Sequence, residues 1–278
     1  DEFLKELFSC FAKKNKTVSR SISICAVGGY GRKQLAPFSD LDLLFLYSNE
    51  VNIKEVEEFI QFLVYPLWDL QLKVGYAVRS EKEAIDLSIK DHVIKTSMLD
   101  ARFICGSKKI FKDTIYKFSS EVRTSGYDLL KDKIAERKEK LVDLGYDYFR
   151  NEPNIKESEG SLRDINLIFW AQKIFTISKR KQSSKLLTRN EKKKLSESLE
   201  FLLLVRCLLH YEARRSCDKL TFDFQHQISK IIISRKPKNK GLQDSVEKMM
   251  RNYFFQIRKT KNLAQIIVRL IKENFEQN

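Results

Sequence analysis

The 278-residue chain has few of the residues that several common catalytic and binding sites require. It contains three histidines and five scattered cysteines, with no Cys-x-x-Cys motif and no Cys/His cluster. This pattern argues against a structural zinc site and a disulfide framework, and it favours a reducing, cytoplasmic compartment. No His-Asp dipeptide occurs either, so the signature of one class of metal-dependent phosphohydrolases is absent.

Long apolar runs are also missing. The longest are the length of a β-strand, and no signal peptide opens the chain, so we expect no association with a membrane. Hydrophobic residues nevertheless make up 42% of the chain and aromatic residues 11%, which is enough to form packed cores. The length suits two modest domains or one large one.

Acidic residues are outnumbered, with 37 Asp and Glu against 52 Lys and Arg, giving a net charge of +15. Such a charge is one mark of a nucleic-acid partner. The densest basic runs, at 179–194 and 235–240, contain no aromatic residue on which a base could stack. We therefore interpret them as solvated segments and do not expect nucleic acid as a partner.

The residues with the clearest chemical meaning are a glycine pair and a carboxylate pair near the N-terminus. Gly28 and Gly29 follow an apolar strand expected over 21–27, and Asp40 and Asp42 begin a second strand expected over 40–47. Side chains at i and i+2 of a strand share a face. Two carboxylates on one face suit a hard divalent cation, Mg²⁺ or Mn²⁺, that also binds substrate phosphates.

The glycines complete this prediction, because backbone without Cβ lets a triphosphate approach its N–H groups. A Gly-Gly pair alone is usually a turn, and an Asp-x-Asp motif alone is usually a solvated strand end. Their succession favours a nucleotidyltransferase that acts on a nucleoside triphosphate.

The remaining pattern indicates an α+β protein in two parts. A helix over 53–70 and a strand over 71–78 follow the carboxylates, and Ser80 with Glu83 forms a capping box for a helix expected to reach about residue 105. After residue 107 the periodicity is helical, with segments at 109–120, 127–148, 161–178, 190–215 and 243–274. We predict an αβ catalytic domain over 1–106 and an all-helical domain over 107–278.

Three blocks of sequence resemble the bifunctional uridylyltransferase/uridylyl-removing enzymes, within the DNA polymerase β-like nucleotidyltransferase superfamily. They are Gly28 to Leu44, Trp68 to Arg79, and Glu152-Pro-Asn-Ile-Lys156 with Gly160-Ser-Leu-Arg-Asp-Ile165. The first is shared across the superfamily, whereas the last is far more specific. The family usually has glycine at the position of Ser161, proline at that of Glu159 and His-Ser at 76–77.

The resemblance implies a polymerase β-like fold whose second, helical domain covers the substrate and the nucleotide. It also implies transfer of UMP from UTP to a tyrosine of a PII-type signal protein, with release of pyrophosphate. Family members carry a hydrolase domain and sensor domains after this region, so we do not expect these residues to remove the nucleotide.

The resemblance further suggests roles for individual residues. Arg32, Ser39 and Arg163 are candidate nucleotide-binding residues, although an ion pair at the sheet edge, a turn cap and an interdomain ion pair explain them nearly as well. The superfamily usually adds a third carboxylate on a neighbouring strand, and Asp69 is the candidate for it. Its alternative is an ordinary aspartate at a helix end.

Other functions remain open at this point. One is adenylyl transfer, or another nucleotidyl transfer, on the same fold. A second is a non-catalytic regulatory module that binds nucleotide, although the intact glycine and carboxylate pairs speak against it. An RNA-binding module rests on net charge alone.

Overall fold

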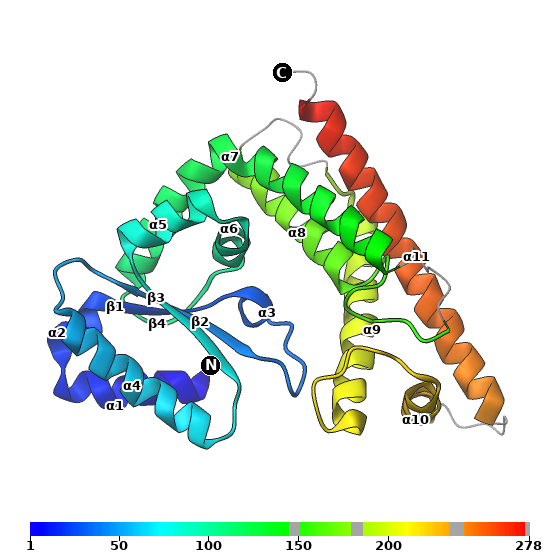
Figure 1. Cartoon of the computed structure of the whole chain (residues 1–278), viewed down its shortest axis with the longest axis horizontal. Helices are drawn as coiled ribbons and strands as arrows, with labels where there is room; N and C mark the ends of the chain where they lie inside the picture. The colour runs from blue at the N-terminus through cyan, green and yellow to red at the C-terminus, as the bar shows by residue number, and fades with distance from the viewer. Residues whose placement is uncertain (145–150, 179–185, 234–241, 276–278) are drawn as a thin grey trace. The chain divides into compact units, whose positions relative to one another are not determined.

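The computed structural model describes residues 1–144, 151–178, 186–233 and 242–275 (Figure 1). The chain forms two compact units, one of Asp1–Leu35 with Ser39–Ser125 and one of Ala36–Phe38 with Gly126–Asn278. The division falls inside one long helix, α7 (Lys108–Asp143). The boundary predicted at 106/107 lies just before this helix begins.

The first unit is built on a mixed sheet of four strands in the order β3-β2-β1-β4. β1 pairs antiparallel with both β2 and β4, whereas β2 and β3 are parallel. The strands span Ile22–Ala26 (β1), Leu41–Tyr47 (β2), Val74–Ser80 (β3) and Arg102–Gly106 (β4). This sheet, followed by helices, confirms the predicted α+β class.

Helices cover both faces of the sheet (Figure 1). One face packs against α1 (Glu2–Lys14), α2 (Lys16–Ser21) and α4 (Ile53–Asp69). The other lies under α5 (Glu81–Lys90), α6 (His92–Leu99) and the first part of α7. Because both faces are covered, β1 is buried along its whole length, which explains why its residues are apolar except for Ser23.

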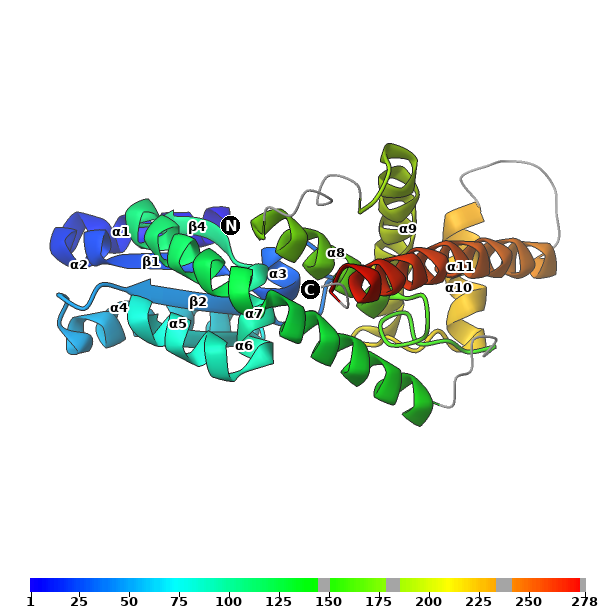
Figure 2. The ribbon, with the colours of Figure 1, turned by 90° about the horizontal axis from the view of Figure 1, so that it is seen from above.

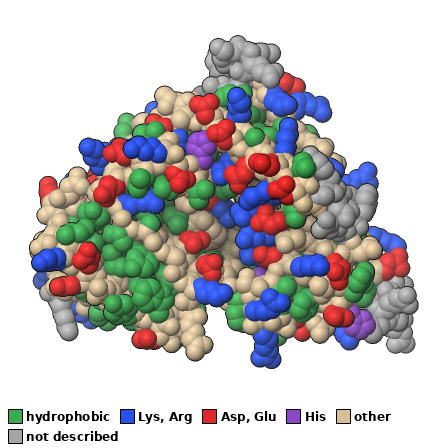
Figure 3. All heavy atoms as spheres, in the orientation of Figure 1, with side chains coloured by type: hydrophobic (Ala, Val, Ile, Leu, Met, Phe, Trp, Pro, Cys, Tyr) green, Lys and Arg blue, Asp and Glu red, His purple; other side chains and the backbone are tan. Residues whose placement is uncertain are grey.

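The structure confirms the capping box of Ser80 and Glu83, which begins α5. The helix expected to run on to residue 105 was wrong, because this stretch contains α5, α6 and β4. Asp91 separates the two helices by capping α6 with its side chain. The outer face of α4 exposes apolar side chains of Phe62, Tyr65 and Trp68 (Figure 3).

Most of the described residues of the second unit are helical, and the non-helical stretches at 151–161 and 214–221 meet in an isolated β-bridge between Asn154 and Lys219. It contains α8 (Leu162–Ile177), α9 (Arg189–Ala213), α10 (Phe222–Ile233) and α11 (Leu242–Phe275). α10 packs against α11 in both views (Figures 1 and 2). The two helices predicted over 109–120 and 127–148 are the single helix α7 as far as Asp143, and α10 was not predicted.

The core of the second unit joins side chains from each of its helices, among them Leu129, Ile165, Ile168, Leu202, Val205, Ile228, Tyr253 and Ile267. The whole basic run at 235–240 and residues 179–185 of the run at 179–194 lie outside the described residues. None of the helices in the described part of the chain is both long and apolar enough to cross a membrane.

Candidate active site

Asp42 lies at the centre of the predicted motif of glycines and carboxylates. Its carbonyl oxygen accepts a hydrogen bond from the Val27 N–H at 3.0 Å, which brings the start of the Gly-Gly turn beside β2. On its other side, Asp42 pairs with Gly75 of β3 in the parallel ladder. The residue therefore lies in the sheet between two segments that each carry a glycine.

Both glycines lie against the carboxylate of Asp42. A Cβ built on Gly28 would lie 2.9 Å from Oδ2, and one built on Gly75 would lie 3.3 Å from Oδ1. Gly28 also has a φ of +55°, which favours glycine over other residues. A larger residue at position 28 would therefore displace the carboxylate, whereas the two glycines leave it room.

Asp40 and Ser39 lie directly before β2, where Asp40 is exposed and Ser39 is half-buried. Alternation along extended chain puts Asp40 and Asp42 on the same side. Among the described residues, no three His, Cys, Asp or Glu side chains lie together in a way that could hold a metal ion. The two aspartates fit a hard divalent cation that completes its coordination with phosphate oxygens and water.

The turn that precedes these carboxylates is a short helix, α3 (Gly28–Gly31). A Cβ on Gly29 would meet nothing within 4 Å, whereas one on Gly31 would lie 2.2 Å from the carbonyl oxygen of Asp100 and 2.9 Å from that of Ala26. Gly31 is therefore required for packing, and Gly29 is not. The open space at Gly29 is compatible with the predicted approach of a phosphate.

Arg32 lies just beyond this turn and forms an ion pair with Asp100, whose side chain is almost fully buried. Its Nε also donates to Gln34 Oε1 at 3.0 Å. These contacts correspond to the alternative interpretation of Arg32, in which it forms an ion pair at the sheet edge. The sequence did not single out Asp100, because the two residues are 68 positions apart and no local pattern links them.

Asp69, the candidate third carboxylate, is the exposed last residue of α4 and not part of β3. The strands β1, β3 and β4 contain no aspartate or glutamate. Cysteine chemistry is also disfavoured in the sheet, because burial raises the pKa of Cys25 and of Cys105 to about 12. Both thiols therefore stay protonated near neutral pH.

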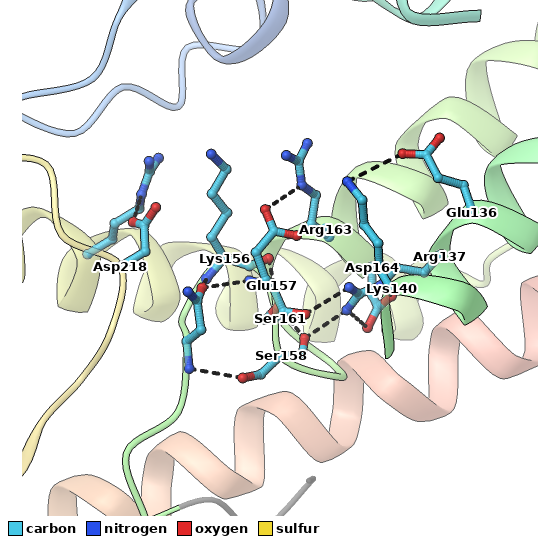
Figure 4. Close-up of polar contacts among 12 residues, drawn as sticks. Glu136, Arg137, Lys140, Lys156, Glu157, Ser158, Ser161, Arg163, Asp164 and Asp218 are labelled. Atoms are coloured by element: carbon cyan, nitrogen blue, oxygen red, sulfur yellow. Dashed lines mark hydrogen bonds and ion pairs between the residues drawn. The ribbon is translucent and has the colours of Figure 1, made fainter. Parts of the chain in front are cut away.

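In the second unit, the block of residues 152–165 folds around one arginine of α7 (Figure 4). Arg137 Nε donates to Asp164 Oδ1 at 2.7 Å and Nη2 donates to Oδ2 at 3.1 Å. The same guanidinium donates to the carbonyl oxygens of Glu157 and Ser158, each at 2.8 Å. Since both charged side chains are nearly buried, this fork fixes the shape of the loop.

Arg163, the predicted nucleotide-binding residue of this unit, donates from Nε to Glu157 Oε1 at 3.0 Å. Arg163 and Asp164 are thus both in ion pairs, each with a partner inside the second unit. The other oxygen of Glu157, Oε2, is buried without a hydrogen-bond partner among the described residues. The ion pair of Glu157 with Arg163 offsets part of the cost of burying this carboxylate.

A second polar cluster surrounds Asp218, which follows α9. Burial raises the pKa of this carboxyl, but hydrogen bonds from His210 and Arg206 outweigh burial and bring it to about 2. Arg206 Nε lies 2.7 Å and His210 Nε2 3.4 Å from Asp218 Oδ1. The other ring nitrogen of His210 accepts from the Phe38 N–H at 3.4 Å, so the contacts match a neutral imidazole with its proton on Nε2.

Comparison with known proteins assigns the chain to a family. Residues 128–268 match the family model described as GlnD PII-uridylyltransferase, and residues 4–104 match that of a nucleotidyltransferase domain. The chain belongs to the GlnD PII-uridylyltransferase family. This confirms the resemblance found in the sequence.

Three curated relatives are named bifunctional uridylyltransferase/uridylyl-removing enzyme. The protein of Phenylobacterium zucineum is 34% identical over 260 residues, covering 92% of this chain and 27% of the relative. That of Rhodospirillum rubrum is 33% identical over 282 residues (98% and 30%), and that of Azospirillum brasilense is 36% identical over 261 residues (92% and 27%). The chain thus spans about 30% or less of the length of these GlnD-type relatives.

The structure explains one departure of this chain from the usual GlnD sequence. The hydroxyl of Ser161, which stands where glycine is usual, is buried and donates to the carbonyl oxygens of Lys156, at 2.8 Å, and Ser158. The serine thus holds the loop closed. At Gly160, φ is +77° and a Cβ would lie 2.3 Å from the Ile257 carbonyl oxygen, so glycine is required there.

Proposed function

We propose that this chain transfers UMP from UTP to a tyrosine of a PII-type signal protein and releases pyrophosphate. The observation that carries the proposal is the carboxylate of Asp42 enclosed by Gly28 and Gly75, directly after the exposed Asp40. Membership of the GlnD family supports the choice of UTP as donor and PII as acceptor. The enzyme class is supported by the match of 4–104 to a nucleotidyltransferase domain.

In the proposed reaction, the tyrosine hydroxyl oxygen of the acceptor attacks the α-phosphorus in line. A P–O bond to tyrosine forms, the bond between the α-phosphorus and the bridging oxygen breaks, and pyrophosphate leaves with that electron pair. A divalent cation, Mg²⁺ or Mn²⁺, neutralises charge on the phosphates when it is bound. Asp40 and Asp42 would hold it.

The other predicted residues act on the triphosphate and on the acceptor. Gly28 and Gly29 leave room for phosphate oxygens beside the backbone, and Ser39 donates a hydrogen bond to one of them. Asp69 accepts the proton of the tyrosine hydroxyl, in the role of general base. Arg32 acts indirectly, because its ion pair with Asp100 holds the segment that follows the glycines.

A direct test is to incubate the chain with each α-labelled nucleoside triphosphate, Mg²⁺ or Mn²⁺, and a purified PII protein. Label and a mass gain of one UMP on PII, from UTP alone and absent with the Asp42→Asn variant, would support the proposal. Transfer from ATP instead would indicate adenylyl transfer. Nucleotide binding with no transfer from any donor would indicate a non-catalytic module.

A further inference from the structure

The loop that precedes α8, at residues 152–161, and the start of α8 carry cationic side chains. Contacts within the second unit use only some of the hydrogen-bond donors of these side chains. Lys156 of this loop and Arg163 of α8 extend in the same direction (Figure 4). Within the described part of the chain, the ammonium of Lys156 forms no hydrogen bond or ion pair, and Arg163 uses only Nε, for Glu157. The terminal nitrogens of Arg163 therefore retain their donors.

Arg206 repeats this arrangement on α9. Its Nε is bound by Asp218 at 2.7 Å, and no described residue binds its terminal nitrogens. The charge of Lys156 is among the causes that lower the pKa of Asp218, so Lys156 also lies near that carboxylate. Each arginine is thus oriented by a carboxylate, and Lys156 lies between Arg163 and Asp218, the partner of Arg206, in the view of Figure 4.

The backbone that carries these side chains is held in place before any ligand binds. Asn154 Oδ1 accepts the N–H groups of Lys156, at 2.9 Å, and Glu157, at 2.8 Å. The Ile155 N–H donates to the Asp218 carbonyl oxygen at 2.8 Å, which joins the loop to the segment after α9. A preorganised set of donors loses little freedom when it binds, which favours affinity.

We propose that Lys156, Arg163 and Arg206 form a site on the helical unit for linked phosphates, such as the polyphosphate of a nucleoside triphosphate or free inorganic polyphosphate. Arginine forks match phosphate oxygens in pairs, and lysine adds a point charge. The three groups come from the loop, from the first turn of α8 and from α9. Linked phosphates can engage cations on several elements at once, whereas one phosphate cannot satisfy so many donors.

Tripolyphosphate is the direct probe, because its binding does not require transfer. We expect calorimetry on the whole chain to show tighter binding of tripolyphosphate and UTP than of UMP. The Lys156→Gln variant should bind tripolyphosphate about tenfold more weakly, since one charge-assisted contact is lost. Lys156→Arg should restore most of the affinity.

The matched control is Lys193→Gln, which removes the same charge from an exposed position of α9. An equal loss of affinity in this control, or wild-type affinity in Lys156→Gln, would overturn the site. RNA is tested as a competitor over the same range of total concentration of phosphate groups. If RNA displaces bound tripolyphosphate at a lower phosphate concentration than unlabelled tripolyphosphate does, the proposed preference for linked phosphates over RNA is overturned. Circular dichroism of each variant checks that it is folded.

The identification of the ligand as a nucleotide rests on the proposed function, and the two can fail separately. A chain that binds tripolyphosphate through Lys156 but transfers no UMP to PII would keep this site and reject the function. A chain that transfers UMP with the same KM for UTP in wild type and Lys156→Gln would keep the function and reject the site.

Discussion

In the first unit the motif residues meet around one carboxylate, Asp42, with glycines where side chains would otherwise crowd it. In the second unit the motif residues bind mainly to one another and to Arg137. The first arrangement leaves open space at Gly29, whereas the second uses most of its polar groups to fix a loop. The more family-specific motif is thus the more structural one, although among the described residues Lys156 and the terminal nitrogens of Arg163 still have unused donors.

This difference implies that substitutions in the two motifs should have different effects. Changes near Asp42 should reduce transfer and leave the free energy of unfolding almost unchanged. Changes at the Arg137–Asp164 pair should reduce stability first. The two tryptophans, Trp68 on α4 and Trp170 on α8, allow the units to be followed separately by fluorescence.

The largest expected effect is on transfer in Asp42→Asn. The substitution removes a charge with almost no change in volume, so in the proposed site the metal and the triphosphate would lose their main anchor. We expect a fall in kcat of roughly a thousandfold or more, because metal ions contribute several kcal/mol to such transition states. Quenched-flow or gel assays of PII labelling measure it, and an unchanged melting temperature shows that the fold is intact. Near wild-type turnover in this variant would reject Asp42 as a metal ligand.

The next largest effect is on stability in Asp164→Ala, which leaves Arg137 buried without its partner. We expect a loss of about 3–5 kcal/mol of unfolding free energy, as for other broken buried pairs. Urea unfolding in a Trp68→Phe background reports the second unit through Trp170. The control is Glu247→Ala, which breaks an exposed pair with Arg251 and should cost less than about 1 kcal/mol. Equal losses in both variants would show that burial of the pair has no consequence.

Smaller effects are expected for the glycines of the turn, where Gly29→Ala should change UTP affinity and Gly31→Ala should change stability. In Gly29→Ala the added Cβ meets open space, so we expect unchanged stability but roughly tenfold weaker UTP binding, since a close phosphate contact is lost. In Gly31→Ala the Cβ meets backbone oxygens, and we expect a loss of about 1–3 kcal/mol. Calorimetric UTP titration and thermal melts measure the two effects. Gly29→Ala with wild-type affinity would make Gly29 a turn residue only.

The smallest effect concerns pH. Because the pKa of Asp218 falls from 3.8 to about 2 on folding, its ionised form stabilises the second unit above pH 4. This contribution, about 1 kcal/mol after allowance for partial exposure, should be lost as the pH falls from about 4 to 2. Urea midpoints across this range measure it. The Asp218→Asn variant should show a flatter profile than wild type, and an identical profile would contradict the assignment.

Short-range patterns predicted much of the fold. The carboxylates at the start of β2, the capping box of α5 and the helices α4, α8, α9 and α11 could all be predicted, because the residues that define them are neighbours in sequence. β4 was missed because its short apolar run continues the pattern of the preceding helices. Pairing with β1 decides its conformation, and that partner lies far away in the chain.

The sequence by itself determined which chemical groups are present and how they are spaced: glycine beside strand ends, two aspartates at i and i+2, and a compact motif in the helical part. Only the tertiary structure decided which of these groups are already engaged. Arg32 meets Asp100 across 68 positions, and Arg137 meets Asp164 across 27. Such pairs form when packing closes the chain, because Coulomb attraction and burial depend on distance in space and not on spacing in sequence.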